Sequence, residues 1–482
     1  MENPVRLAGL EPASVFGYFE KLCSIPHGSW NNQPVSDYLV SFAKEHGLRY
    51  LQDGHQNVIL FQPGTAGYED HPPVILQGHM DMVCEKDAEC TIDFLKDGLD
   101  VTHDGDVVFA RGTTLGGDDG IAVAYALALL DDPTIPHPPL EIIITTDEEV
   151  GMLGADAIDL SMLKGRTLIN LDSEEEGIFT VACAGGVRST LTLPVGRRAV
   201  YGPCIRLSVE ELRGGHSGVE IDKNRANANK VMGEFLSRIQ KLMPLCITSM
   251  SGGSKDNAIP RECHVNAVAM GIGLERINGI AEALQAEVRA AYDEPNVIVR
   301  ADDVDALGGN GLTTEDSGKV IGLLCAAPNG VQAMSEEMPG LVQTSLNMGI
   351  VSLSEDSFSM TFSLRSSVNG EKDDLKDKLR ELAGLYHAGY SEMGEYPAWE
   401  YRADSPLRDL MVDTYRKLFG KEPVVVSIHA GLECGLLSDK LPGLDCVSIG
   451  PQMHDIHTSR EKLEIASTAR TWNFLLEILS QL

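Results

Sequence analysis

Residues 140–151 read LEIIITTDEEVG, in which a run of branched residues at 142–146 is followed by three consecutive carboxylates. A short, uninterrupted run of branched residues is typical of a strand that is buried on both faces, as in a parallel sheet. The acidic residues follow this run directly. In open α/β sheets the ligand crevice lies at the carboxyl ends of the strands. This stretch therefore predicts a parallel sheet and also the edge of that sheet at which a site should lie.

Two other segments repeat the pattern of an apolar strand that leads into a polar residue. Residues 74–78 (VILQG) precede His79, and residues 167–171 (TLINL) precede Asp172. A helix of small residues, 120–127 (GIAVAYAL), lies between the strands at 74–78 and 140–145 in the chain. This alternation predicts an α/β fold with a mostly parallel central sheet.

The pattern changes near residue 187 and returns near residue 400. Between these points, alternating strands (189–193 and 204–209) accompany amphipathic helices at 226–242, 279–291 and 372–386. After residue 400 the sequence predicts a helix at 406–419, strands at 423–428 and 445–450, and a last helix at 468–482. We therefore predict one α/β domain, built from residues 1–186 and 400–482, that is interrupted by an inserted α+β domain at 187–399.

The composition excludes several classes of partner. The chain has 39 Lys and Arg against 71 Asp and Glu, a formal net charge of −32, which argues against binding to nucleic acid or to anionic membranes. No apolar run approaches the roughly 18 residues of a spanning helix. Residues 1–4 (MENP) lack the features of a signal peptide. The ten cysteines include no CxxC pair, a pattern typical of free thiols. We expect a cytoplasmic protein.

Histidine and carboxylate side chains recur in five segments. These are 78–83 (GHMDMV), 112–120 (GTTLGGDDG), 145–151 (TTDEEVG), 170–176 (NLDSEEE) and 453–461 (MHDIHTSRE). Each segment alone has an ordinary interpretation as a loop histidine, a helix N-cap or a solvated acidic loop. Together they bring histidines and several carboxylates to one sheet edge, which is the ligand set that divalent metals such as Zn²⁺ prefer.

The charges of these segments favour two metal ions over one. Asp118 and Asp119 are adjacent, and like charges repel unless a cation lies between them. Three ligating carboxylates and one hydroxide balance the charge of two divalent ions, whereas a single ion leaves the acidic cluster under-compensated. Hydrolases with two metals hold the ions close together, bridged by a carboxylate and a water.

In this order and spacing, GHMDM, GGDDG, TTDEEVG, NLDSEE and HDIHTSRE resemble the dinuclear zinc peptidases of family M20, most closely the aminoacyl-histidine dipeptidase branch. The similarity covers nearly the whole chain, including the insertion point. It implies a zinc-peptidase-like catalytic domain interrupted by a lid domain. It also implies two Zn²⁺ per chain, although the ligand set admits Co²⁺ or Mn²⁺ as well.

The resemblance implies a role for each matching residue. Asp118 would bridge the two metals, and Asp81 would orient the imidazole of His79. Glu148 would act as general base, taking a proton from the attacking water and passing it to the leaving amine. The choice between adjacent acidic residues comes from the family pattern alone. The implied metal ligands are His79, Asp118, Glu149, Asp172 and His457.

The inserted domain and a late turn supply candidate substrate contacts. His216, in GGHSG, resembles a lid histidine that contacts the reacting carbonyl; the alternative is a simple turn histidine. Asn257 and Arg365 resemble lid residues that hold the terminal carboxylate of the substrate, although Arg365 could equally form a structural ion pair. Glu433, in a glycine-rich turn, is a candidate to receive the free α-amine of the substrate.

We therefore expect a metal-dependent dipeptidase that hydrolyses unblocked dipeptides, including Xaa-His substrates such as β-Ala-His. The alternatives are an M20-like deacylase or tripeptidase with the same dinuclear site, and a metal-binding protein without catalysis, which would not need Glu148. A lid hinged near residues 186 and 400 would close over the substrate. The inserted domain either forms a homodimer interface or, if it is duplicated, imitates one within a single chain.

Overall fold

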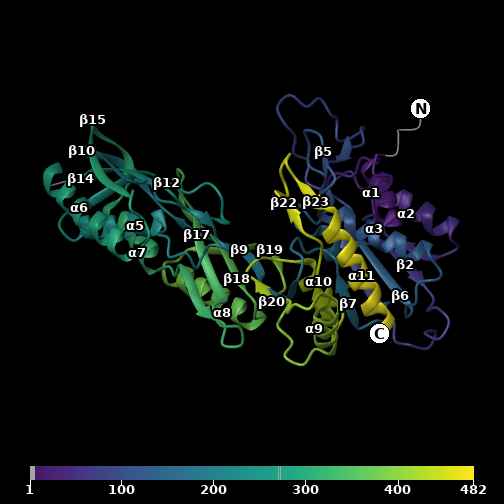
Figure 1. Ribbon diagram of the computed structural model, residues 1–482. Helices are drawn as coiled ribbons and strands as arrows, with labels where there is room; N and C mark the ends of the chain where they lie inside the picture. The colour runs from purple at the N-terminus through teal and green to yellow at the C-terminus, as the bar shows by residue number, and fades with distance from the viewer. Residues whose placement is uncertain (1–5, 270, 272) are drawn as a thin grey trace. The chain divides into compact units, whose positions relative to one another are not determined.

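The computed structural model describes residues 6–269, 271 and 273–482, which form two compact units (Figure 1). The first unit comprises Met1–Ala182, Tyr401–Ser427 and Leu432–Leu482, and the second comprises Cys183–Glu400 and Ile428–Gly431. The sequence pattern predicts that residues 428–431 belong to the α/β domain, with the rest of 400–482. The structure joins them to the second unit, where the Ala184 N–H donates to the carbonyl of Ile428 (3.1 Å) and His429 contacts Ser345.

The first unit is built on an eight-stranded mixed sheet. In spatial order the strands are β1 (Arg49–Gln52), β2 (Val58–Gln62), β6 (Leu140–Thr145), β3 (Val74–His79), β7 (Thr167–Asn170), β21 (Asp445–Ser448), β8 (Ile178–Cys183) and β20 (Val424–Ile428). The four central strands β6, β3, β7 and β21 are parallel to one another, whereas the pairs β1–β2, β2–β6 and β21–β8 are antiparallel.

Helices cover this sheet. They are α1 (Ala13–Cys23), α2 (Gln33–Glu45), α3 (Gly117–Asp131), α4 (Leu153–Ala157), α9 (Pro406–Phe419), α10 (Glu433–Lys440) and α11 (Ile465–Gln481). The small-residue helix α3 is buried over 117–130, as expected of a helix that is apolar on all sides. The Tyr125 hydroxyl donates to the carbonyl of Thr468 (2.9 Å) and its ring stacks on Trp472. The C-terminal helix α11 therefore packs against the N-terminal core (Figure 1).

Gly78 allows α3 to approach β3 closely. A Cβ atom at this position would lie 2.4 Å from Oδ2 of Asp119 and 2.6 Å from Cβ of Ala122. The same Oδ2 atom accepts a hydrogen bond from the main-chain N–H of His79 (3.1 Å). The absence of a side chain at residue 78 thus brings the first turn of α3 to the end of β3. A four-stranded sheet completes the unit: β22 (Met453–His454), β23 (Lys462–Glu464), β5 (Val107–Ala110) and β4 (Val101–His103).

The second unit has the predicted α+β character. Its large sheet contains, in spatial order, β15 (Ile298–Leu312), β10 (Arg197–Glu210), β14 (Cys263–Ala269), β12 (Leu245–Gly252), β17 (Val342–Leu353), β18 (Ser357–Ser366), β9 (Gly185–Pro194) and β19 (Gly389–Tyr396), with β16 (Gly330–Met334) paired to β17. All the strand pairs described for this sheet are antiparallel. A separate short pair joins β11 (Gly215–His216) and β13 (Ala258–Ile259).

Four helices form one apolar core with the large sheet of the second unit. They are α5 (Ala228–Gln240), α6 (Leu274–Ala291), α7 (Thr314–Ala326) and α8 (Asn369–Leu385). Side chains from all four helices join those of the strands in a single buried cluster that includes Phe235, Leu284, Leu323 and Leu379. The helices therefore pack on one face of the sheet, and the strands show the alternation of a sheet with one covered face. Within the described residues, no helix is both long and apolar enough to span a bilayer.

Candidate functional site

The five predicted metal ligands converge in the first unit, although residues 79 and 457 lie far apart in the chain. Three overlapping groups have their ligand atoms within 4.8 Å of one another: His79 with Glu148 and Glu149, His79 with Asp118 and Asp172, and Asp118 with Glu149 and His457. Four of these residues follow the carboxyl ends of the parallel strands β3, β6 and β7 or open the helix α3. The predicted sheet edge is therefore the place of the cluster.

His79 is buried and directs one ring nitrogen into the cluster. Its Nε2 lies 3.1 Å from Oδ1 of Asp118 and 3.4 Å from Oδ1 of Asp172. Its Nδ1 faces the main-chain oxygen of Asp81 (3.0 Å) and lies 3.4 Å from Oδ1 of the same residue. An acceptor at Nδ1 fixes the tautomer, so that Nε2 is the nitrogen available to a metal ion.

Asp118 lies between the two histidines. Its Oδ1 faces Nε2 of His79, and its Oδ2 lies 3.1 Å from Nε2 of His457. His457 is also 3.0 Å from Oε1 of Glu149. Asp118 thus belongs to two of the three groups and presents one oxygen to each, as a carboxylate shared by two ions requires.

The electrostatics of the cluster fit divalent cations. Burial raises the pKa of Asp172 to about 7 and raises the pKa of Glu148 well above its usual range. Hydrogen bonds to Asp118 and Glu149 raise the pKa of His457 to about 11. Buried carboxylates that repel one another are stabilised by a cation among them. Imidazole nitrogens and carboxylate oxygens are also donors that Zn²⁺ accepts.

Asp81 organises the loop that follows β6. Its side chain is 1% exposed, its Oδ1 accepts the main-chain N–H of Glu148 (3.0 Å), and its Oδ2 accepts the hydroxyl of Ser29 (2.8 Å) and the N–H of Glu149 (3.4 Å). One carboxylate therefore contacts His79 and also holds the backbone of the two adjacent glutamates. Asp81 therefore remains a candidate to orient the imidazole of His79.

The second unit contains His216, Asn257 and Arg365. Nδ1 of His216 accepts the main-chain N–H groups of Gly218 (3.1 Å) and Val219 (3.3 Å). Burial, followed by the charge of Arg365, lowers the pKa of this imidazole. The neutral ring therefore carries its proton on Nε2, which is left as a hydrogen-bond donor.

Asn257 and His216 line one cavity of about 670 Å³ within the second unit. Asn257 is exposed, and its main-chain carbonyl accepts the N–H of Ser217 (2.9 Å). Arg365 is buried and donates through Nη1 to the hydroxyl of Tyr396 (3.2 Å), while its Nε has no partner among the described residues. No carboxylate pairs with Arg365 in the described part of the chain, which disfavours the structural ion pair considered from the sequence.

Glu433 does not offer an exposed carboxylate to a substrate amine. Its side chain is fully buried, and Oε2 accepts hydrogen bonds from Nε2 of Gln77 (2.5 Å) and the hydroxyl of Thr145 (2.7 Å). Asn170 donates to Oε1 of Gln77 (2.5 Å). This buried layer of four polar residues joins β3, β6, β7 and α10. Three of them lie two or three residues before His79, Glu148 and Asp172 in the chain, so the geometry favours a supporting role over amine recognition.

Sequence reasoning missed Gln77, Asn170 and Glu461. The first two interrupt otherwise apolar buried strands, and a polar residue in such a strand is a signal of a buried network. Glu461 is buried and accepts N–H groups of the 115–118 loop. It ends the motif 453–461, but nothing local predicts what it holds, because its partners lie more than 340 residues away in the chain.

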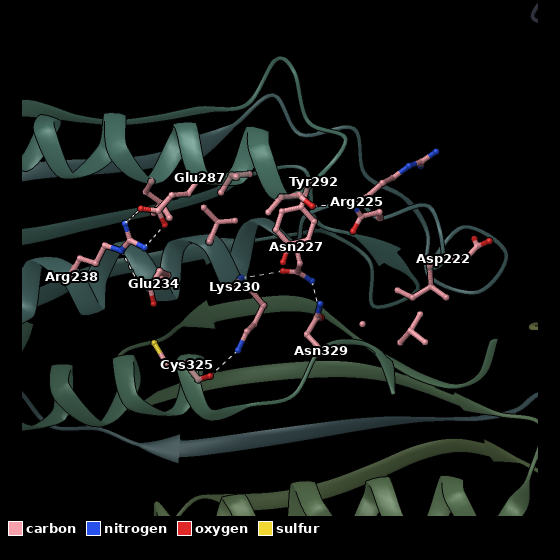
Figure 2. A pocket seen from close by; sticks show the side chains of 18 residues that line it. Asp222, Arg225, Asn227, Lys230, Glu234, Arg238, Glu287, Tyr292, Cys325 and Asn329 are labelled. Carbon is pink, nitrogen blue, oxygen red and sulfur yellow. Dashed lines mark hydrogen bonds and ion pairs between the residues drawn. The ribbon is translucent and has the colours of Figure 1, made fainter. Parts of the chain in front are cut away.

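A second cavity in the second unit, of about 580 Å³, is lined by α5, α6 and the end of α7 (Figure 2). Arg238 pairs with Glu234 (2.7 Å) and Glu287 (2.6 Å). Lys230 donates to three main-chain carbonyls at the end of α7 and just beyond it, those of Leu324, Cys325 and Ala327. These two cations have partners within the unit, and none of the three candidate metal groups found among the described residues includes a residue of this lining.

Comparison with known proteins agrees with this geometry. Residues 75–481 match the model described as Peptidase family M20/M25/M40. The chain is 39% identical over 482 residues to the cytosol non-specific dipeptidase of Escherichia coli (strain K12), covering 99% of each chain. The crystal structure of aminoacylhistidine dipeptidase from Vibrio alginolyticus matches with a TM-score of 0.92 and 35% identity, over 100% of this chain and 98% of that one.

The structure of aminopeptidase PepT from Bacillus cereus ATCC 10987, at 14% identity and a TM-score of 0.57, covers 98% of this chain and 99% of its own, and shares the fold. The family resemblance predicted from the five motifs is therefore confirmed. The chain belongs to peptidase family M20/M25/M40.

Proposed function

We propose that this protein is a metal-dependent dipeptidase that hydrolyses unblocked dipeptides, Xaa-His dipeptides among them. The observation that carries the proposal is the position of Asp118, with one oxygen toward His79 and the other toward His457, beside the paired Glu148 and Glu149. The names of two full-length relatives, a non-specific dipeptidase and an aminoacylhistidine dipeptidase, support the substrate class. The cytosolic location of the first relative supports a cytoplasmic protein.

Two zinc ions are the proposed cofactors, and the donor set also admits Co²⁺ or Mn²⁺. One ion would be held by His79, Asp118 and Asp172, and the other by Asp118, Glu149 and His457. When bound, such a pair supplies Lewis acidity and lowers the pKa of a water molecule toward neutrality.

Glu148 is the proposed general base. Burial raises its pKa, and a carboxylate with a raised pKa can take a proton from water and later deliver it to the leaving amine. Asp81 positions this residue by accepting its main-chain N–H. The side chain of Glu148 thereby performs both proton transfers at one place.

The second unit supplies the proposed substrate contacts. The Nε2–H group of His216 is a suitable donor for the oxygen that becomes negative during attack on the carbonyl, since its Nδ1 is already an acceptor. Arg365 has an unpartnered Nε, and Asn257 shares a cavity with His216, so both remain candidates to hold the terminal carboxylate.

The test is hydrolysis of an unblocked Xaa-His dipeptide and of its N-acetylated counterpart by chelator-stripped protein, with and without added Zn²⁺. We expect zinc to restore cleavage of the unblocked peptide alone. Cleavage of the acetylated peptide alone would contradict the proposal and assign the protein to the deacylases, and no cleavage of either peptide would exclude this substrate class.

Glu433 provides a separate test of substrate recognition. Because its Oε2 is held by Gln77 and Thr145, Glu433→Gln can keep both hydrogen bonds through its amide oxygen. We expect the KM for an unblocked dipeptide to change by no more than about twofold, because the variant keeps the hydrogen bonds of residue 433. A large rise in KM for the unblocked peptide would instead restore the role of Glu433 as the acceptor of the substrate amine.

A further inference from the structure

Glu461, which is not one of the candidate metal ligands, connects two distant parts of the cluster. Its side chain is 3% exposed, and it lies four residues after His457. Its two oxygens accept hydrogen bonds from four consecutive main-chain N–H groups, those of Leu115 (2.8 Å), Gly116 (3.2 Å), Gly117 (2.8 Å) and Asp118 (3.4 Å). One carboxylate therefore holds the whole loop that presents Asp118.

The loop needs such an acceptor because its N–H groups do not belong to the regular turns of a helix. Asp118 (φ −82°, ψ 103°) and Asp119 (φ −119°, ψ 31°) lie within the bounds of α3 but have non-helical backbone angles, and Gly116 before them has no side chain with which to cap the loop. A carboxylate satisfies such donors with charge-assisted hydrogen bonds. Among the described residues, no Lys, Arg or His forms an ion pair with Glu461, so its recorded side-chain partners are these N–H groups.

Glu461 and His457 belong to the same turn, between β22 and β23. The Thr458 hydroxyl donates to the carbonyl of Asp455 (2.7 Å), and the Glu461 N–H donates to the carbonyl of Thr458 (3.2 Å). This turn fixes the distance between a carboxylate that holds the backbone of Asp118 and an imidazole that contacts the side chain of Asp118. One short segment therefore holds both the main chain and the side chain of Asp118.

We propose that Glu461 is a positioning residue for the metal centre. It caps the 115–118 loop so that Asp118 presents one oxygen to each ligand group, and it keeps His457 in register with Asp118. The inference rests on the proposed function only in that the five clustered residues bind metal ions.

The test is Zn²⁺ binding to chelator-stripped E461Q, measured by isothermal titration calorimetry. Glutamine keeps the length of the side chain, but it replaces one accepting oxygen with an NH₂ group that faces N–H donors. We expect the ion held by Asp118, Glu149 and His457 to bind about 10–100-fold more weakly, as is typical when an outer partner of a metal site is lost. Binding of both ions at the affinity and stoichiometry of the wild type would overturn the proposal.

A second variant decides the matter if E461Q fails to fold. G117A places a Cβ atom 3.2 Å from Oε1 of Glu461 and 3.1 Å from Sδ of Met453, so it separates the loop from the carboxylate without removing any candidate ligand. We expect one Zn²⁺ ion to bind about as weakly to G117A as to E461Q. If a folded G117A binds both ions with the wild-type affinity, this would count against Glu461 as the positioning residue.

E464Q is the matched control. Glu464 lies three residues further along, and its Oε1 contacts Nε2 of His454 (2.8 Å) rather than the 115–118 loop. We expect E464Q to bind zinc as the wild type does, and equal weakening in E464Q and E461Q would overturn the proposal by reducing the effect to lost charge. Failure of the wild-type protein to bind zinc would instead refute the proposed function.

Discussion

At the scale of single residues, the adjacent Glu148 and Glu149 have different surroundings. Oε1 of Glu149 lies 3.0 Å from Nε2 of His457, in the group that contains Asp118. The side chain of Glu148 has no such hydrogen bond among the described residues, and burial raises its pKa. A carboxylate that keeps a high pKa is suited to carry a proton, whereas one in contact with two ligand groups is suited to hold an ion.

Glu148→Gln should therefore remove catalysis while leaving metal binding intact. We expect kcat to fall by about 10²–10⁴-fold, the usual contribution of a general base, with an unchanged zinc content measured by atomic emission. Glu175→Gln, in an exposed position after β7, is the control and should keep both quantities. Substantial activity in Glu148→Gln would refute its assigned role.

His429 should make the second unit sensitive to acid. Burial, with a smaller contribution from the charge of Arg365, lowers the pKa of this histidine to about 3, and its Nε2 contacts the hydroxyl of Ser345 (2.7 Å). The unfolded chain takes up the proton near pH 6.5 and the folded chain only near pH 3, so stability is full above pH 6.5 and falls as the pH drops through this range.

The effect of His429 is measured as the change in the free energy of unfolding with pH. For one proton this slope approaches about 1.4 kcal/mol per pH unit. In urea unfolding between pH 7 and pH 4, His429→Gln should lose this part of the pH dependence. An identical pH dependence in the variant and the wild type would show that folding does not lower the pKa of His429.

At the scale of elements, the approach of α3 to β3 determines where the first turn of α3 lies. Gly78→Ala should lower the free energy of unfolding by about 1–3 kcal/mol, because its Cβ would meet Oδ2 of Asp119 at 2.4 Å. Thermal unfolding measures this change. Gly17→Ala is the matched control, because Gly17 lies in α1 with nothing within 4 Å of an added Cβ, and it should stabilise the protein by about 0.5–1 kcal/mol. Equal stabilities of the two variants would contradict the role of close packing at residue 78.

The elements that the sequence predicted well are those with a local signal. The strand expected at 140–145 and the helix expected at 406–419 have these bounds in the structure, because an apolar run closed by charges and a Ser-Pro start each mark an element locally. The metal-type ligands were found for the same reason, since each follows a recognisable strand or loop. The contacts of Glu461 and Glu433 could not be predicted, because their partners, the 115–118 loop and Gln77, are brought to them only by the tertiary fold.

At the scale of the whole molecule, each unit has its own apolar core, and all five candidate ligands belong to the first unit. A ligand that binds only a folded unit raises the stability of that unit by mass action. Addition of a chelator should therefore lower the melting temperature of one calorimetric transition and leave a second transition in place. Gly78→Ala identifies the transition of the first unit, and an equal shift of both transitions on chelation would contradict the assignment of the metal centre to one unit.

The first unit is built from separate segments of the chain, so its ligands are not made together. Chains emerge from the ribosome with the N-terminal end first. His79, Asp118 and Asp172 are therefore made before the second unit, whereas His457 and Glu461 are made after it. The second unit, Cys183–Glu400 with Ile428–Gly431, is complete before either of them. A nascent chain thus lacks a complete set of ligands until the whole second unit and then His457 have been made, so peptide hydrolysis cannot begin before that point.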